Sequence, residues 1–154
     1  MPFESLARCT DCHTIMHHHE TSDHDCPNDP MKDPVKRAEA EEWEARFEAT
    51  TKMWEDWVEE NAPHIKTAYP SIDNHPDEIA FHGQCFLHLP HDGFWGEGEA
   101  YTSRNYTNPT WGEVLIEFEK AIIQTGDYHH SFLEGLNLSK KVCSVQILEF
   151  STGS

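Results

Sequence analysis

The longest regular pattern of apolar and polar positions runs over residues 34–61 and predicts one amphipathic helix. Asp33 can cap its start, and Pro34 stands at the first helical position, where its missing N–H costs no hydrogen bond. Pro63 ends it. Five large apolar side chains fall mostly on one stripe: Trp43, Phe47, Trp54, Trp57 and Val58. We expect this stripe to dock against the protein's own sheet, the usual role of a wide apolar face.

A second helix is predicted over residues 111–125. Thr110 and Glu113 form a capping-box pattern at its start. Gly126 stands where a left-handed C-terminal cap would lie. The apolar stripe consists of Val114, Leu115, Phe118, Ala121 and Ile122.

The strands are predicted by alternation of apolar and polar residues. Residues 79–89 alternate as in a half-buried strand. One face of it carries Ile79, Phe81, Gly83, Cys85, Leu87 and Leu89. Residues 94–103 predict an antiparallel partner. Residues 131–138 and 142–150 predict a hairpin whose tight turn is Ser139-Lys140-Lys141.

The element order is therefore α-β-β-α-β-β, and we predict an α+β fold. A four-stranded, mainly antiparallel sheet covered by helices is the economical packing, with one domain over residues 34–154. Residues 1–33 are rich in Cys, His, Asp and Pro and lack apolar periodicity. We expect them to form a loop-dominated segment before that domain. Cys85 and Cys143 fall at apolar strand positions and are expected in the core.

Acidic residues dominate the chain: 28 Asp and Glu face 11 Lys and Arg among 154 residues, a formal net charge of -17. Such a surface repels nucleic-acid phosphates and anionic lipid, and it attracts a basic partner or cations. Solubility alone is a simpler explanation of the charge. No apolar run is long enough to span a membrane. The first residues lack a basic region and an apolar region, so we expect a cytoplasmic location.

The cysteines and histidines near the start predict a metal site. Cys9 and Cys12 have the two-residue spacing that lets one turn bind one ion, and Cys26 and His24 follow. Three thiolates and one imidazole would complete a tetrahedral structural zinc site, so the predicted ligands are Cys9, Cys12, His24 and Cys26.

Three alternatives to zinc remain open for this segment. Cys9, Cys12 and His13 also match the attachment pattern of a c-type haem, which is attached after export. A redox pair of Cys9 and Cys12 would normally follow a strand, and nothing before Cys9 predicts one. The third alternative is free thiols in a flexible polar arm.

Six histidines lie in the region of the predicted sheet: His75, His82, His88, His91, His129 and His130. His82 and His88 share one strand face, where they could bind a metal or act as general acid and base. Of the adjacent His129 and His130, at most one can join them, because neighbouring strand residues point to opposite faces. Surface histidines of an acidic protein are the simpler explanation.

These patterns favour a small non-enzymatic binding or regulatory protein with a structural zinc ion and a basic protein partner. Nucleic-acid mimicry would be its extreme form. The acidic face of the 34–61 helix is the expected docking element: Glu39, Glu41, Glu42, Glu44, Glu55, Glu59 and Glu60. The alternative is a metal-dependent hydrolase using the sheet-region histidines, and a c-type haem electron carrier is a minor one.

Overall fold

The chain divides into two compact units, Met1–Ala49 and Thr50–Ser154. The computed structural model describes residues 6–8, 15–17, 26, 32–91 and 93–154. In the first unit, β1 (Leu6–Arg8) and β2 (Ile15–His17) form an antiparallel two-stranded sheet. The sequence predicted no strand before Cys9, and β1 corrects that expectation. A strand of three residues is too short to show a period of two.

Helix α1 (Pro34–Asn61) has the predicted bounds. Its start is capped as expected, because the backbone N–H of Val35 donates to Asp33 Oδ1 over 3.0 Å. The helix passes from the first unit into the second at Thr50. The expected division of the chain into residues 1–33 and residues 34–154 stays a prediction.

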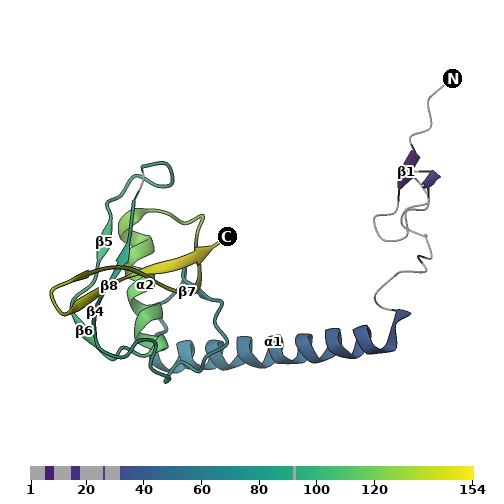
Figure 1. The fold of residues 1–154 in the computed structure, drawn as a ribbon, viewed down its shortest axis with the longest axis horizontal. Helices are drawn as coiled ribbons and strands as arrows, with labels where there is room; N and C mark the ends of the chain where they lie inside the picture. Colours follow the sequence, from purple (N-terminus) through teal and green to yellow (C-terminus); the bar gives the residue numbers. More distant parts are fainter. Residues whose placement is uncertain (1–5, 9–14, 18–25, 27–31, 92) are drawn as a thin grey trace. The chain divides into compact units, whose positions relative to one another are not determined.

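The second unit is built on a mixed six-stranded sheet with helix α2 (Trp111–Thr125) packed beside it (Figure 1). Its strands are β3 (Tyr69–Pro70), β4 (Gln84–Leu89), β5 (Tyr101–Thr102), β6 (Tyr106–Thr107), β7 (Phe132–Val142) and β8 (Val145–Gly153). The order is β3-β7-β8-β4-β5, and β6 also pairs with β4. The β3–β7 and β4–β8 pairs are parallel, and the other pairs are antiparallel.

The α+β class is confirmed, but the four-stranded, mainly antiparallel sheet is wrong. The strands β3 and β6 have two residues each and therefore show no alternation. The predicted strand 79–89 begins only at Gln84, because Gly83 takes a φ of 123° and interrupts it. Parallel pairing of β4 with β8 joins segments about sixty residues apart, and local patterning carries no signal for it.

The core lies between α2 and the sheet. The capping box of Thr110 and Glu113 and the left-handed Gly126 are both present, as predicted. The predicted apolar stripe of α2 is fully buried. Cys85, Leu87 and Leu89 of β4 are buried against it, while Phe81 is partly buried at its edge.

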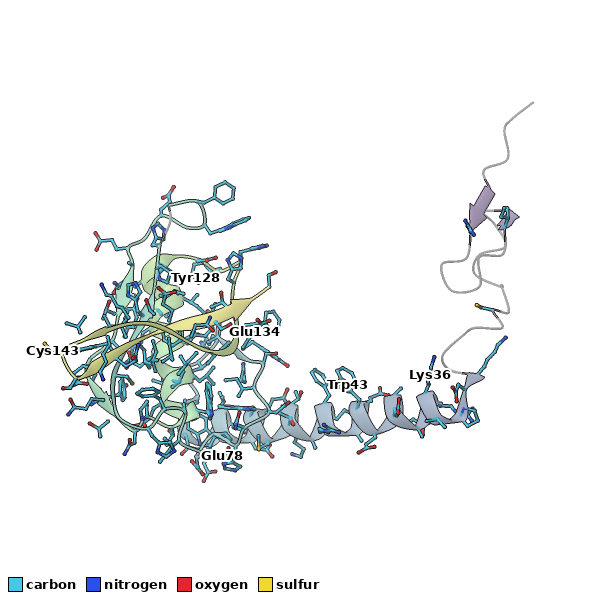
Figure 2. The ribbon with its side chains drawn as sticks, in the orientation of Figure 1. Lys36, Trp43, Glu78, Tyr128, Glu134 and Cys143 are labelled. Carbon is cyan, nitrogen blue, oxygen red and sulfur yellow. The ribbon has the colours of Figure 1, made fainter. Side chains whose placement is uncertain are left out.

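The hairpin of β7 and β8 turns later than predicted. Ser139, Lys140 and Lys141 belong to β7, and the turn lies at Cys143, whose φ is 56°. Cys143 is exposed at the tip of the hairpin (Figure 2), so its expected place in the core is wrong. The hairpin is exposed to solvent beyond Leu138. The strand residues there are therefore polar, and in the sequence they look like a turn.

The aromatic stripe of α1 is used internally only in part. Trp54 is buried, and Trp57 is partly buried against the core. Trp43 and Phe47 are 63% and 54% exposed, so the expectation that the whole stripe docks on the sheet is wrong. Within the described residues, no helix combines the length and apolar character needed to cross a membrane.

Candidate functional site

The predicted zinc site lies almost entirely outside the described residues. Cys9, Cys12 and His24 belong to the segments that the structure leaves undescribed, and Cys26 is buried. Across the described residues, no group of three or more His, Cys, Asp or Glu side chains is placed to hold a metal ion. The zinc ligands therefore stay a prediction.

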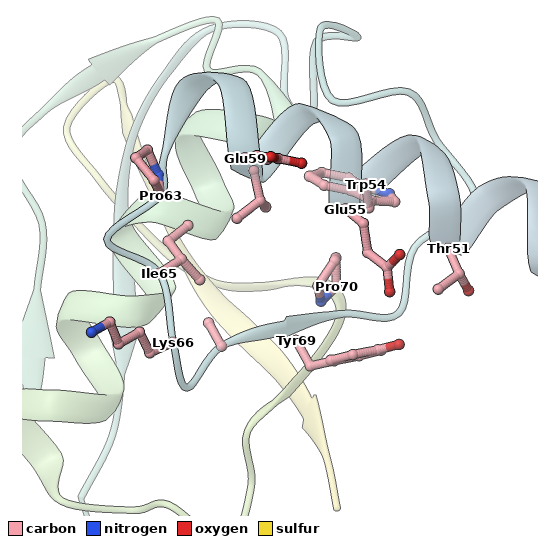
Figure 3. A pocket seen from close by; sticks show the side chains of 11 residues that line it. Thr51, Trp54, Glu55, Glu59, Pro63, Ile65, Lys66, Tyr69 and Pro70 are labelled. Atoms are coloured by element: carbon pink, nitrogen blue, oxygen red, sulfur yellow. The ribbon is translucent and has the colours of Figure 1, made fainter.

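A groove of about 410 Å³ opens in the second unit beside the C-terminal half of α1 (Figure 3). One wall is α1, and the other is the segment from Pro63 to Pro70, which ends in β3. The lining is Thr51, Trp54, Glu55, Val58, Glu59, Pro63, Ile65, Lys66, Ala68, Tyr69 and Pro70. Most of this lining is apolar, and the volume lies within the range of small-ligand and side-chain pockets.

The wall formed by α1 is fixed by Trp54. Its indole Nε1 donates to the carbonyl oxygen of Ile72 over 3.0 Å, and the side chain is 1% exposed. Trp57 meets it edge to face, with ring centroids 5.9 Å apart. Gly112 lets α2 pack closely against Trp57, because a Cβ at this position would lie 2.3 Å from the Trp57 ring. The groove is therefore bounded by a side chain already locked in the core.

The opposite wall is fixed by a buried carboxylate. Glu119 of α2, 4% exposed, accepts hydrogen bonds from three successive backbone amides. The N–H of Lys66 and that of Thr67 donate over 3.1 and 3.2 Å, and that of Ala68 over 2.6 Å. A carboxylate bound by several amides holds a loop in one conformation. The segment facing α1 is thus shaped before any ligand arrives.

The charged side chains of the groove lie on both walls, with the carboxylates on α1. Glu55 and Glu59 of α1 line it and are exposed, while Lys66 lines it from the other wall. In Figure 3 the carboxylate of Glu55 lies near Thr51 and Pro70. An apolar floor with acidic groups at the rim suits an apolar side chain followed by a basic one.

A second cavity of about 350 Å³ contains two of the predicted histidines. It is lined by Leu89, Pro90, His91, Trp95, Asp127, His130, Glu149, Phe150 and Thr152. His130 Nδ1 lies 2.9 Å from Asp127 Oδ2, and the backbone N–H of His130 donates to the same carboxylate. His91 Nε2 lies 3.1 Å from the carbonyl oxygen of Gly96.

Of the six predicted histidines, the second cavity brings together His91 and His130. His129 stacks on Trp95 with ring centroids 4.3 Å apart, while His130 lines the cavity, so only one of this adjacent pair joins it. His88 is instead hydrogen-bonded to Thr102 across the β4–β5 pair, at 2.9 Å. His82 lies before β4, which begins at Gln84, so the expectation that His82 and His88 share one face of a strand is wrong.

A buried polar cluster surrounds Glu117, which is 2% exposed. Tyr101 and Tyr106 donate their hydroxyls to its carboxylate, the latter over 2.7 Å, and Lys120 Nζ approaches to 2.8 Å. Burial alone would raise the pKa of Glu117, but these three hydrogen bonds together lower it. Burial, and then the bond to Glu117, raises the pKa of Tyr106 to about 12. Every group here is satisfied, so the cluster stabilises the fold.

The groove was not predicted from the sequence, which indicated only a connecting loop over residues 63–77. One signal was present. Glu119 lies next to the apolar stripe of the second helix, and a carboxylate at such a position requires internal donors. The structure supplies these donors from the loop over residues 63–77.

Comparisons of the chain with protein-family models, with curated proteins and with solved structures find no match.

Proposed function

We propose that this protein is a non-enzymatic binding protein whose groove captures a basic segment of a protein partner. An apolar side chain of the partner would fill the space beside Trp54 and Val58. An adjacent Arg or Lys would meet the carboxylates of Glu55 and Glu59. The observation that carries the proposal is a fixed apolar groove with two carboxylates in its lining.

Preorganisation supports binding by this groove. Both walls are held by hydrogen bonds to buried groups, Trp54 on one side and Glu119 on the other. Because the groove is already ordered, a ligand that binds there loses less conformational entropy. The affinity is correspondingly higher. The edge strand β3 lies beside the groove, and strand edges commonly receive extended peptides.

The chemistry of the lining favours binding over catalysis. It contains no His, Cys or Ser, the side chains that most often supply the base or the nucleophile in covalent catalysis. The net charge of -17 adds long-range attraction for a basic partner and repulsion for nucleic-acid phosphates. A regulatory protein that occupies a basic site, with carboxylates in place of phosphates, is one form of this proposal.

The structural zinc ion remains part of the proposal, with Cys9, Cys12, His24 and Cys26 as its ligands. Cys-x-x-Cys with a further Cys and His is typical of closed tetrahedral sites. Its role would be to hold the segment around these residues, since the second unit has a core of its own.

Hydrolysis is the second candidate function, and the His130–Asp127 pair in the second cavity favours it. A histidine oriented by a carboxylate can act as a general base. Assays with p-nitrophenyl acetate and p-nitrophenyl phosphate test this candidate, with His130→Gln as the control. Turnover that His130→Gln abolishes would replace the binding proposal with an enzymatic one.

The binding proposal is tested by fluorescence anisotropy with two labelled twelve-residue peptides. Both carry a central Leu, flanked by Arg in one and by Glu in the other. We expect only the Arg peptide to bind, and more weakly as salt rises. Glu55→Lys should weaken binding about tenfold, whereas Glu60→Lys, outside the groove lining, makes the same change in net charge with a smaller effect. Equal effects of the two reversals would contradict the proposal.

A further inference from the structure

The first half of α1 carries an apolar seam that nothing in the described residues covers. Trp43 and Phe47 stack on each other with ring centroids 5.4 Å apart and planes 13° apart. Every described residue from Lys32 to Ala49 is exposed. Trp43 and Lys36 project from the same side of the helix (Figure 2). A helix of this length gains most of its stability from packing, and the described residues supply none to this half.

The seam follows the spacing of a coiled coil. Steps of four and three residues link Lys36, Ala40, Trp43, Phe47, Thr50, Trp54 and Trp57. On this seam Trp54 is buried and Trp57 is partly buried in the protein's own core. No residue in the described part of the chain covers Trp43 and Phe47, which precede them. Such a spacing fits a second helix lying along the same seam.

We propose that the first half of α1 pairs with the same segment of a second copy of this chain as an antiparallel two-helix coiled coil. Full overlap of residues 34–49 with their counterpart places residue i opposite residue 83 − i. In this register Trp43 lies opposite Ala40 of the second copy, and Ala40 opposite its Trp43. A large side chain against a small one is the arrangement that lets two helices interdigitate.

The charges beside the seam favour this register. Glu39 is brought to Arg46 of the second copy, and Arg37 to its Glu44, which gives four opposite-charge pairs by symmetry. Within one chain Arg46 already approaches Glu42 at 3.7 Å, but both side chains are more than half exposed and can rearrange. A parallel pair would instead set Glu39 against Glu44 and is disfavoured. The remaining acidic residues, such as Glu48, face outward.

This inference does not depend on the groove, because none of the seam residues from Lys36 to Thr50 lines it. The pairing is short, about two heptads, and the two copies carry the same net charge. We therefore expect a weak dimer with a dissociation constant in the micromolar range.

Sedimentation equilibrium of the full-length chain from 5 to 500 µM tests the proposal. We expect a monomer–dimer equilibrium that Trp43→Ala abolishes. Glu39→Arg should weaken it at least tenfold, and adding Arg46→Glu to that variant should restore it. The control is Glu48→Arg, which changes net charge equally at an outward position and should change the dissociation constant less than threefold.

Three outcomes would overturn the proposal. One is a monomer throughout this range, which would leave the seam to another part of the chain or to a different protein. Another is a dimer that survives Trp43→Ala. The third is equal weakening by Glu39→Arg and Glu48→Arg. Circular dichroism of each variant confirms that α1 remains helical, so that loss of the dimer is not loss of the helix.

Discussion

Trp54 donates its indole hydrogen to the carbonyl oxygen of Ile72 over 3.0 Å, which joins the C-terminal half of α1 to the segment beyond the groove. Trp54→Phe keeps an aromatic ring, but it removes the donor to this buried carbonyl and part of the buried indole volume. We expect a loss of about 1–3 kcal/mol in the free energy of unfolding, measured by urea denaturation. Trp43→Phe, at an exposed position of the same helix, should change it by no more than about 0.5 kcal/mol.

Glu119 holds the other wall of the groove. Glu119→Gln removes the charge from an acceptor of three backbone amides, so we expect a loss of about 1.5–3 kcal/mol in stability. Amide exchange of Lys66, Thr67 and Ala68 should accelerate more than exchange in α2. Unchanged exchange of these three amides would show that the carboxylate does not hold the segment.

The polar cluster of Glu117 predicts how stability varies with pH. Hydrogen bonds lower the folded-state pKa of Glu117, so its contribution is present above the ordinary glutamate pKa and is lost as pH falls through the folded value. The pKa of Tyr106 is raised to about 12, so its contribution is present below pH 10 and is lost as pH rises toward 12. Urea midpoints across pH 3–11.5 should fall at both ends. In Tyr106→Phe the alkaline decline should become smaller.

The elements that could be predicted from the sequence are those whose signals are local. Pro34 after Asp33, and Thr110 with Glu113, define helix starts by the chemistry of their own hydrogen bonds, and both are confirmed. The alternation around Cys85 and Leu87 predicts the central strand because one of its faces is buried. These signals depend on neighbours within a few residues.

The remaining features depend on contacts between distant residues. The parallel pairing of β4 with β8 and the two-residue β3 leave no local period. The groove exists because Glu119 binds amides about fifty residues away. The Trp stripe predicted a buried face of α1, but not which part of that face is buried. Trp43 and Trp54 are the same residue type and lie on the same side of the helix, yet only Trp54 is buried.

Metal removal tests the predicted zinc site in the first thirty residues. Elemental analysis of the purified protein should give one zinc ion per chain, and less in Cys12→Ser. Chelation should then accelerate amide exchange in residues 1–30 while the urea midpoint of the second unit stays unchanged, because that unit has its own core. Zinc-free protein with unaltered exchange in the segment would exclude the site.

Peptide binding in the groove is tested by an NMR titration of the ¹⁵N-labelled chain with the Arg-flanked peptide. We expect the largest shifts on the indole N–H of Trp54 and on the amides of Glu55, Val58, Lys66 and Tyr69. The amides of the second cavity, such as His130, should remain unshifted. Saturable binding whose shifts instead centre on His91, Asp127 and His130, or no shift at millimolar peptide, would contradict it.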